Sequence, residues 1–208
     1  MSPATRRARA RRGEGELLRA EILAAAERLL IKTGDEGAVS IRAIADAAGV
    51  TPPSIYLHFA DKTELLAAVC EARFEDFARY LEEATAGVDD PLEALRARGR
   101  AYVRFGLENP EHYRILFMTR PGVDRQPKAI EDLPGMTAFS RLVEDVARGM
   151  DSGLLAQGDS FLVATGLWSA VHGVTSLLIA RPDFPWPDID RLLGHVLEAA
   201  VRGLEPHA

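Results

Sequence analysis

The chain contains a single cysteine, Cys70, among 208 residues. One thiol cannot form a disulfide within the chain, and it excludes a C-x-x-C metal or redox site. The sequence also lacks an H-E-x-x-H zinc motif, a G-x-S-x-G nucleophile turn and a glycine-rich phosphate loop. We therefore expect no catalytic residues, no metal and no cofactor, with a helical enzyme as an open alternative.

Sustained alternation of apolar and polar residues, which is the pattern of a half-buried strand, is absent as well. Apolar residues make up 47% of the chain, which is ample for a packed core. The basic start runs into LLRAEILAAAERLL, where Glu and Arg interrupt any apolar segment of a secretory signal. We expect a folded, all-α protein of the cytoplasm.

Residues 161–180, FLVATGLWSAVHGVTSLLIA, contain no Asp, Glu, Lys or Arg. At ~1.5 Å per residue, a helix of this length could cross a ~30 Å bilayer. His172, the glycines, several Ser and Thr, and the lack of basic or aromatic flanks on both sides favour a helix buried in protein instead. We expect no membrane contact, and a membrane anchor remains the alternative.

Residues 40–62, SIRAIADAAGVTPPSIYLHFADK, indicate two short helices joined by a turn and followed by a third helix. Ser40 is a good N-cap for the first helix, and Gly49 can adopt the positive φ that commonly ends one. Thr51 can cap the second helix. Two prolines occupy the first positions of that helix, where a missing N–H costs little because those donors are unpaired anyway.

The second and third helices carry the candidate surface groups. Ile55 and Phe59 lie four residues apart and are expected to face inward, which leaves the intervening side chains outward. Asp61, three residues before Glu64, resembles a capping box at the start of the third helix. Lys62 lies at the positive end of that helix, where a cation is useful if a phosphate lies close by.

The pattern S-I-R-x-I-A-x-A-A-G-V-T-x-x-x-I-Y-x-H-F-x-D-K-x-x-L resembles the DNA-binding domain of the TetR family of bacterial transcription regulators. The resemblance implies a helix-turn-helix at about residues 40–59 within a domain of residues 15–77, which reads the major groove and holds phosphates. The candidate DNA-binding residues are Ser40, Arg42, Thr51, Pro53, Ser54, Tyr56, Leu57, His58 and Lys62. Many family members have Gly or Thr where this chain has Pro53 and Ser54. This difference concerns which operator sequence is recognised and leaves the mode of docking unchanged. Tyr56 could instead cover the core edge, and His58 could be a packing histidine.

Positive charge is concentrated before and within this segment, although the whole chain carries a net charge of −6. Through Lys62 there are 10 Lys and Arg against 8 Asp and Glu, or +2, and beyond it 15 against 23, or −8. Most of the positive charge lies in RRARARR, residues 6–12, within a predicted disordered basic arm of residues 1–14. Such an arm can follow phosphates or enter a minor groove, and its contact with DNA stays open.

Apolar periodicity, prolines and glycines predict about nine helices in all. A helix from about residue 16 to 33 supports the DNA-binding helices, and residues 121–134 are expected to form a loop. The later helices are expected at about residues 61–85, 91–109, 110–118, 136–150, 159–180 and 189–203. Residues 78–205 would then form a C-terminal regulatory and dimerisation domain. Its segments PEHYRILF, residues 110–117, and Trp168-x-x-x-His172-Gly173 resemble modules of one TetR subgroup.

The last two helices, at about residues 159–180 and 189–203, offer apolar faces for pairing across a two-fold axis in a homodimer. A dimer would place two heads on successive major-groove turns, ~34 Å apart, and predicts a roughly palindromic operator. Aromatic and polar side chains could line a cavity for an unknown small-molecule effector, although aromatics at helical spacing are usually core. The candidate lining residues are Tyr102, Phe105, His112, Tyr113, Phe117, Phe139, Trp168 and His172.

The sequence therefore predicts a dimeric regulator that binds double-stranded DNA, interpreted as a repressor whose DNA affinity falls when a small molecule binds the C-terminal domain. A ligand-independent DNA-binding regulator is the first alternative.

Overall fold

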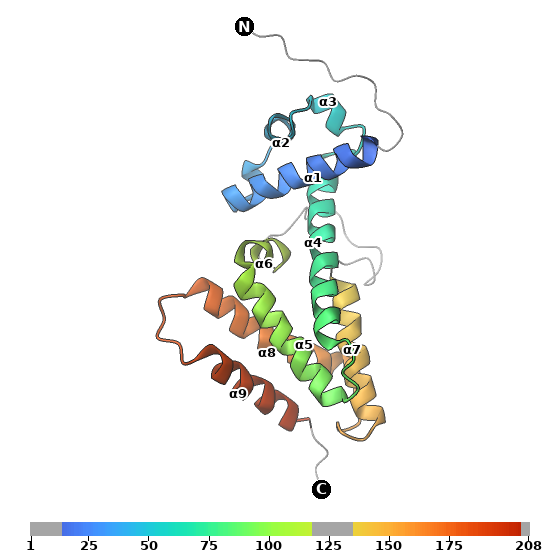
Figure 1. The fold of residues 1–208 in the computed structure, drawn as a ribbon, viewed down its shortest axis with the longest axis vertical. Helices are drawn as coiled ribbons and strands as arrows, with labels where there is room; N and C mark the ends of the chain where they lie inside the picture. Colours follow the sequence, from blue (N-terminus) through green and yellow to red (C-terminus); the bar gives the residue numbers. More distant parts are fainter. Residues whose placement is uncertain (1–13, 118–134, 205–208) are drawn as a thin grey trace. The chain divides into compact units, whose positions relative to one another are not determined.

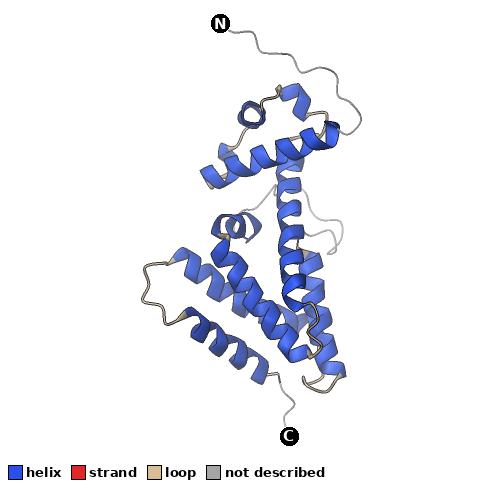
Figure 2. Ribbon diagram, in the orientation of Figure 1, coloured by secondary structure: helices blue, strands red, loops and turns tan. Residues whose placement is uncertain are grey.

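The computed structural model describes residues 14–117 and 135–204, and this part of the chain consists of helices without strands (Figures 1 and 2). The predicted basic arm up to residue 13 and the predicted loop of residues 121–134 lie outside the described residues. The elements are α1 (Glu14–Thr33), the 3₁₀ helix η1 (Glu36–Ala38), α2 (Ile41–Ala48), α3 (Pro52–Ile55), α4 (Lys62–Thr85), α5 (Pro91–Glu108), α6 (Pro110–Phe117), α7 (Met136–Asp151), α8 (Ser160–Ala180) and α9 (Ile189–Arg202). Nine α-helices in the described ranges confirm the predicted all-α class.

Two compact units divide the chain within α4, between Cys70 and Glu71. The N-terminal unit has a small core in which Ile22, Ile44 and Ile55 are completely buried. Cys70 belongs to this core, and burial, assisted by the negative charge of Glu36, raises the pKa of its thiol to about 11. The thiol is therefore uncharged at neutral pH, as expected of a small core residue.

The C-terminal unit is organised around α5, which packs against α6, α7, α8 and α9. Two glycines permit this close packing. A Cβ atom at Gly99 would approach Leu197 of α9, and one at Gly106 would approach Thr175 of α8, each to less than 3 Å. The larger core cluster contains Phe77, Tyr102 and Tyr113, among other residues. Glycine is thus needed on α5 because the neighbouring helices leave no room for a methyl group.

The second helix of the helix-turn-helix is shorter than the sequence indicates. α3 ends at Ile55, and residues 56–58 form hydrogen-bonded turns instead of continuing the helix to Phe59. The N–H of Ser54 donates to the carbonyl of Thr51, and the N–H of His58 donates to that of Ile55. These three-residue spacings tighten both ends of the segment, and the two prolines supply no N–H donors of their own.

α8 is the apolar segment singled out in the sequence, and it is long and apolar enough to cross a membrane by length and composition. Only 22% of its most apolar window is buried within the protomer. The expected burial is therefore incomplete in a single chain. Leu162 and Leu177 are 68% and 52% exposed, so an apolar face of α8 remains open.

Candidate nucleic-acid interface and ligand cavity

The first half of the helix-turn-helix has the end structures that the sequence predicts. The hydroxyl of Ser40 accepts a hydrogen bond from the N–H of Ala43 at 3.1 Å and so caps α2. Gly49 ends α2 with φ of 67°, a left-handed conformation that favours glycine. Together the cap and the glycine fix where α2 begins and where the chain turns towards α3.

Thr51 occupies the N-cap position of α3, but its side chain makes no capping hydrogen bond. Its hydroxyl lies 2.9 Å from the hydroxyl of Ser54 instead. Both hydroxyls therefore stay near the surface, where each retains capacity to accept or donate a further hydrogen bond.

The candidate DNA-contacting side chains lie over a buried support. Ile55 and Phe59 are buried in the N-terminal unit, and the guanidinium of Arg19 lies over the Phe59 ring at 5.0 Å. Tyr56 and Leu57 project outward, with 55% and 82% of their surface exposed. Of the nine candidates, the exposed ones are Ser40, Arg42, Thr51, Pro53, Tyr56 and Leu57, and the half-buried ones are Ser54, His58 and Lys62.

Lys62 has a structural contact that the sequence does not reveal. Its ammonium donates a hydrogen bond to the backbone carbonyl of Glu36 at 3.1 Å, which joins the start of α4 to η1. At the same helix end, the carboxylate of Asp61 accepts from the N–H of Glu64 at 2.7 Å, and the carboxylate of Glu64 accepts from the N–H of Ala60 at 2.6 Å. The predicted capping box is therefore present. The Glu64 carboxylate accepts from the N–H of Ala60, one residue before the N-cap Asp61, instead of from that of Asp61 itself. A lysine ammonium has three donors, so the Glu36 contact leaves capacity for a phosphate.

The C-terminal unit contains a cavity of about 610 Å³, within the usual size range of small-molecule sites. Its described walls come from α4, α5, α6, α7, α8 and α9 and are mostly apolar. Tyr102, Phe117, Phe139 and Trp168 of the predicted set line it. They are joined by residues that sequence reasoning did not select, including Phe74, Leu116, Leu142, Phe161 and Leu197.

The other four predicted residues do not line this cavity. Phe105 packs its ring against Phe77 and Tyr80 in the core. His112 lies beside a separate hollow of about 300 Å³. Tyr113 and His172 belong to a polar chain that includes the lining residue Tyr102. Apolar periodicity identifies which face of a helix is inward, but it does not distinguish a packed position from a cavity wall.

The polar chain links aromatic side chains of α5, α6 and α8. The indole N–H of Trp168 donates to the Tyr102 hydroxyl at 3.2 Å. The Tyr102 and Tyr113 hydroxyls lie 3.0 and 2.6 Å from Nδ1 of His172. Burial raises the pKa of Tyr102 above its usual range, raises that of Tyr113 to about 12, and lowers the pKa of His172. These side chains are therefore uncharged together near neutral pH.

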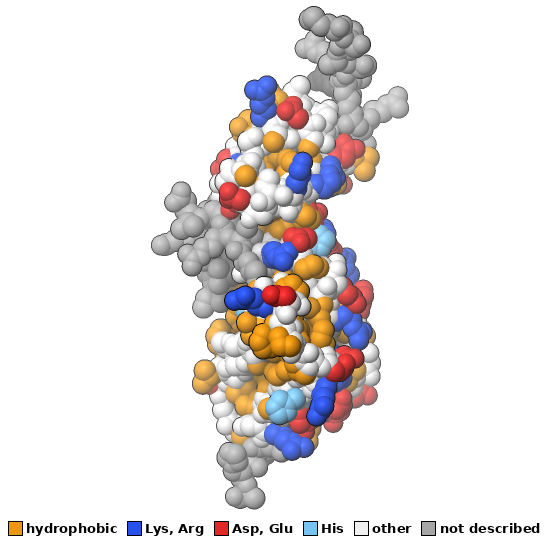
Figure 3. All heavy atoms as spheres, turned by 90° about the vertical axis from the view of Figure 1, so that its left-hand side faces the viewer, with side chains coloured by type: hydrophobic (Ala, Val, Ile, Leu, Met, Phe, Trp, Pro, Cys, Tyr) orange, Lys and Arg blue, Asp and Glu red, His pale blue; other side chains and the backbone are white. Residues whose placement is uncertain are grey.

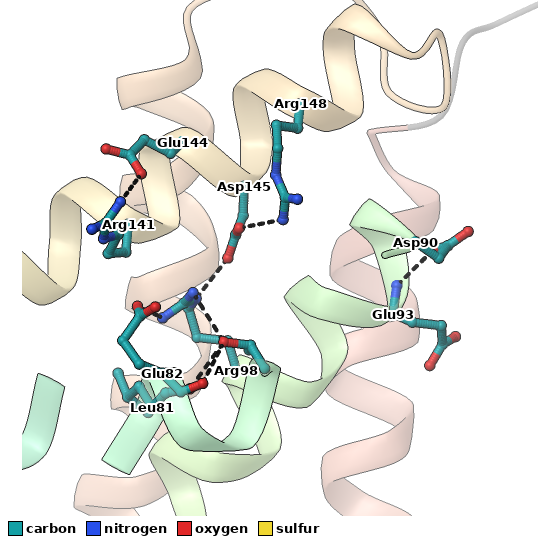
Figure 4. Close-up of polar contacts among 10 residues, drawn as sticks. Leu81, Glu82, Asp90, Glu93, Arg98, Arg141, Glu144, Asp145 and Arg148 are labelled. Atoms are coloured by element: carbon teal, nitrogen blue, oxygen red, sulfur yellow. Dashed lines mark hydrogen bonds and ion pairs between the residues drawn. The ribbon is translucent and has the colours of Figure 1, made fainter. Parts of the chain in front are cut away.

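Arg98, which lines the cavity, belongs to an ion cluster that includes Asp145 (Figure 4). The Nε–H of Arg98 donates to Asp145 at 2.7 Å, and its terminal nitrogens reach Glu82 at 3.0 Å and Thr85 at 3.4 Å. Asp145 also accepts from Arg148 at 2.7 Å. The cluster joins α4, α5 and α7. Sequence reasoning missed it because charged residues in amphipathic helices usually indicate a solvated face.

Within the described ranges, no three His, Cys, Asp or Glu side chains are grouped so that they could hold a metal ion.

A family model described as bacterial regulatory proteins of the tetR family matches residues 22–69. A second, described as a tetracyclin repressor-like C-terminal domain, matches residues 95–200, about half of the chain. The chain belongs to the TetR family. As a TetR-family protein it is a DNA-binding transcription regulator with a helix-turn-helix, in a family where ligand-responsive DNA binding is typical.

Individual proteins are similar to this chain over much of its length. The HTH-type transcriptional activator FasR of Mycolicibacterium smegmatis is 29% identical over 153 residues, which span 72% of this chain and 66% of that protein. A solved protein of unknown function from Rhodococcus sp. RHA1 has a TM-score of 0.78 and 26% identity, covering 91% of this chain and 96% of that one. A TetR family transcription regulator from Marinobacter aquaeolei VT8 has a TM-score of 0.74 at 23% identity, covering 95% and 100%, and shares the fold.

Proposed function

We propose that this TetR-family protein binds a roughly palindromic operator as a homodimer and that a small molecule in the C-terminal cavity changes its DNA affinity. Residues 15–77 act as the DNA-binding domain and residues 78–205 as the regulatory and dimerisation domain. The observation that carries the proposal is the exposed pair Tyr56 and Leu57, held by the buried Ile55 and Phe59 beneath them. This support holds the Tyr56 hydroxyl and the Leu57 side chain outward, where they can contact a phosphate and a base edge.

In this proposal the nine candidate residues divide by chemistry. Arg42, Thr51, Ser54 and His58 present hydrogen-bonding groups that suit base edges, and Pro53 and Leu57 supply apolar contacts. Tyr56 and Lys62 hold phosphates, which set the position of the reading head on the duplex. Ser40 acts through its cap on α2, which fixes the helix that carries Arg42.

The homodimer forms through α8 and α9. Leu162, Gly166 and Leu177 are exposed on α8, and the Cα positions of Gly166, Gly173 and Gly194 have nothing within 4 Å of an added Cβ atom. Small residues on an open face allow a partner helix to approach closely. The C-terminal unit also shows a gathering of hydrophobic side chains on one face (Figure 3). Pairing would remove from water the part of α8 that the protomer leaves exposed, and it gives the apolar helix a role without a membrane.

Regulation works by a population shift: a ligand that prefers one dimer state over another moves the equilibrium by its difference in affinity. A difference of ~1–3 kcal/mol suffices for a partial switch. In this proposal the protein acts as a repressor, although FasR, to which it is similar, is named an activator. The protein is not an enzyme in this account, and it acts in the cytoplasm, where its DNA lies.

The test is selection of genomic fragments by the purified full-length protein. Enriched fragments should share an inverted repeat whose half-sites are about one helical turn apart, and binding should weaken steeply as salt rises. Absence of enrichment over input DNA at low salt would contradict the proposal. A compound that releases the enriched fragments would separate a ligand-responsive regulator from one that binds DNA without a ligand.

A further inference from the structure

The described wall of the cavity is almost entirely apolar. Seven aromatic rings line it, and most of the other described lining residues are aliphatic or glycine. Among the described lining residues there is no Asp, Glu, Lys or His, and Arg98 is the only one with a charge. Where it contacts the described wall, a ligand that enters therefore exchanges water for mostly apolar surface.

The charge of Arg98 is already matched inside the protein. Its guanidinium contacts the carboxylates of Asp145 and Glu82, and its side chain is only 7% exposed. An anionic ligand placed at this guanidinium would lie close to two carboxylates that hold the same nitrogens. Arg98 is therefore a poor anchor for a second anion.

The remaining hydrogen-bond donors on the described wall are also occupied. The Thr165 hydroxyl donates to the carbonyl of Phe161 at 2.8 Å, and the Trp168 indole donates to Tyr102. The Tyr102 hydroxyl has Nδ1 of His172 at 3.0 Å as an acceptor. A strongly hydrated ligand group would lose its water here without gaining donors in exchange.

We infer that this cavity takes an uncharged, predominantly apolar molecule and discriminates against ligands of the same shape that carry a carboxylate or an ammonium group. The inference rests on the proposed function for the use of the cavity as an effector site, and it adds the chemical class of the effector. Lone pairs on the Tyr102 and Thr165 oxygens can accept from one neutral donor, such as a hydroxyl. Aromatic faces attract cations, but no described carboxylate lines the wall to complete such a site.

The chain supplies its own reporter, because it has two tryptophans and one of them, Trp168, lines the cavity. Trp186 lies between α8 and α9, where its indole donates to the carbonyl of Arg181. A Trp186→Phe variant leaves Trp168 as the only indole. Titration with 1-decanol, decanoate and decylammonium near neutral pH then compares one apolar body with neutral, negative and positive head groups.

The expected result is saturable change of Trp168 fluorescence with 1-decanol at a dissociation constant at least ~10-fold lower than for either ion. Equal or tighter binding of decanoate or decylammonium would overturn the inference. Failure of all three to bind would overturn it as well, because the cavity would then not accept an apolar chain.

Two neighbouring positions on α7 provide a matched control. Ala138 lines the cavity, whereas Thr137 is exposed and is not among the lining residues. Ala138→Phe should weaken 1-decanol binding at least ~10-fold, and Thr137→Phe should leave it unchanged, with helical content unaltered in both. If both variants bind like the parent, the ligand lies elsewhere and the inference fails.

These titrations contain no DNA, so their outcome is independent of the regulatory proposal. Binding of 1-decanol without any effect on operator affinity would support the ligand class and contradict the effector role. If decanoate lowers operator affinity and 1-decanol does not bind, the cavity has an effector role but the inferred ligand class is wrong.

Discussion

At the scale of single residues, His172 shows how packing sets the charge of a side chain. Burial lowers its pKa below the ordinary value of about 6.5, and the hydroxyls of Tyr102 and Tyr113 lie against its Nδ1 atom. The folded protein therefore prefers the neutral imidazole. As pH falls through 6.5, the unfolded chain takes up the proton first, so the free energy of unfolding decreases until the lower folded pKa is passed.

The prediction is that His172→Gln loses part of this pH dependence. Urea unfolding at about pH 7.5 and about pH 5.5 should show a smaller loss of stability in the variant than in the parent. All other side chains are identical in the two proteins, so their contributions cancel in the comparison. The same loss in parent and variant would show that His172 is not held neutral.

The sequence predicts the role of a residue well when that role depends on its immediate neighbours in the chain. Ser40 and Gly49 act through their own backbone neighbourhood, and both have the predicted roles. Lys62 is different, because its contact with the carbonyl of Glu36 depends on a 3₁₀ helix that no motif indicates. Residue type and helical spacing predict His112 and Phe105 as cavity residues, but they do not determine which side chains border an empty space.

At the scale of elements, Asp145 connects α7 to α5 directly and to α4 through the guanidinium of Arg98. It accepts from Arg98 of α5, whose guanidinium also contacts Glu82 of α4, and it is itself part of α7. The side chains of Arg98 and Asp145 are 7% and 8% exposed, so neither charge is well hydrated. Removal of one partner leaves the other buried with less compensation.

We predict that Asp145→Asn lowers the free energy of unfolding by ~3 kcal/mol. Its matched control is Glu144→Gln, the adjacent residue on α7, whose ion pair with Arg141 is exposed (Figure 4). That exposed pair should contribute little to stability because water and salt screen it. Chemical denaturation of the two variants measures the difference, and equal effects would contradict the structural role of the cluster.

Helix positions were predictable because each begins or ends at a strong signal. Asp90, Asp159 and Asp188 cap α5, α8 and α9 with their carboxylates, close to the predicted bounds. α3 is shorter than the apolar spacing predicts, because the chain turns after Ile55, although the N–H of Phe59 still donates to the carbonyl of Ile55. The pairing of helices around Gly99 and Gly106 depends on contacts far apart in the sequence, which periodicity does not contain.

At the scale of the whole molecule, binding to a palindromic operator requires two protomers. We predict that Leu177→Glu, which places a charge on the open face of α8, converts the dimer to a monomer, because a carboxylate in an apolar interface loses its water without a partner. Sedimentation should show the mass of one chain, and operator affinity should fall with it. Leu154→Glu, at an exposed leucine between α7 and α8, is the control and should remain dimeric. A dimeric Leu177→Glu protein would place the interface elsewhere.

The most direct test of the central claim is the affinity of a labelled operator duplex, taken from the fragment selection, for the parent protein and for Tyr56→Ala. Tyr56 is exposed and supported from beneath, so its removal should leave helical content and dimer mass unchanged. Leu17→Ala, at an exposed leucine of α1, is the control. We expect Tyr56→Ala to weaken binding at least ~10-fold and Leu17→Ala to leave it unchanged. Unchanged operator affinity in the folded, dimeric Tyr56→Ala protein would contradict it.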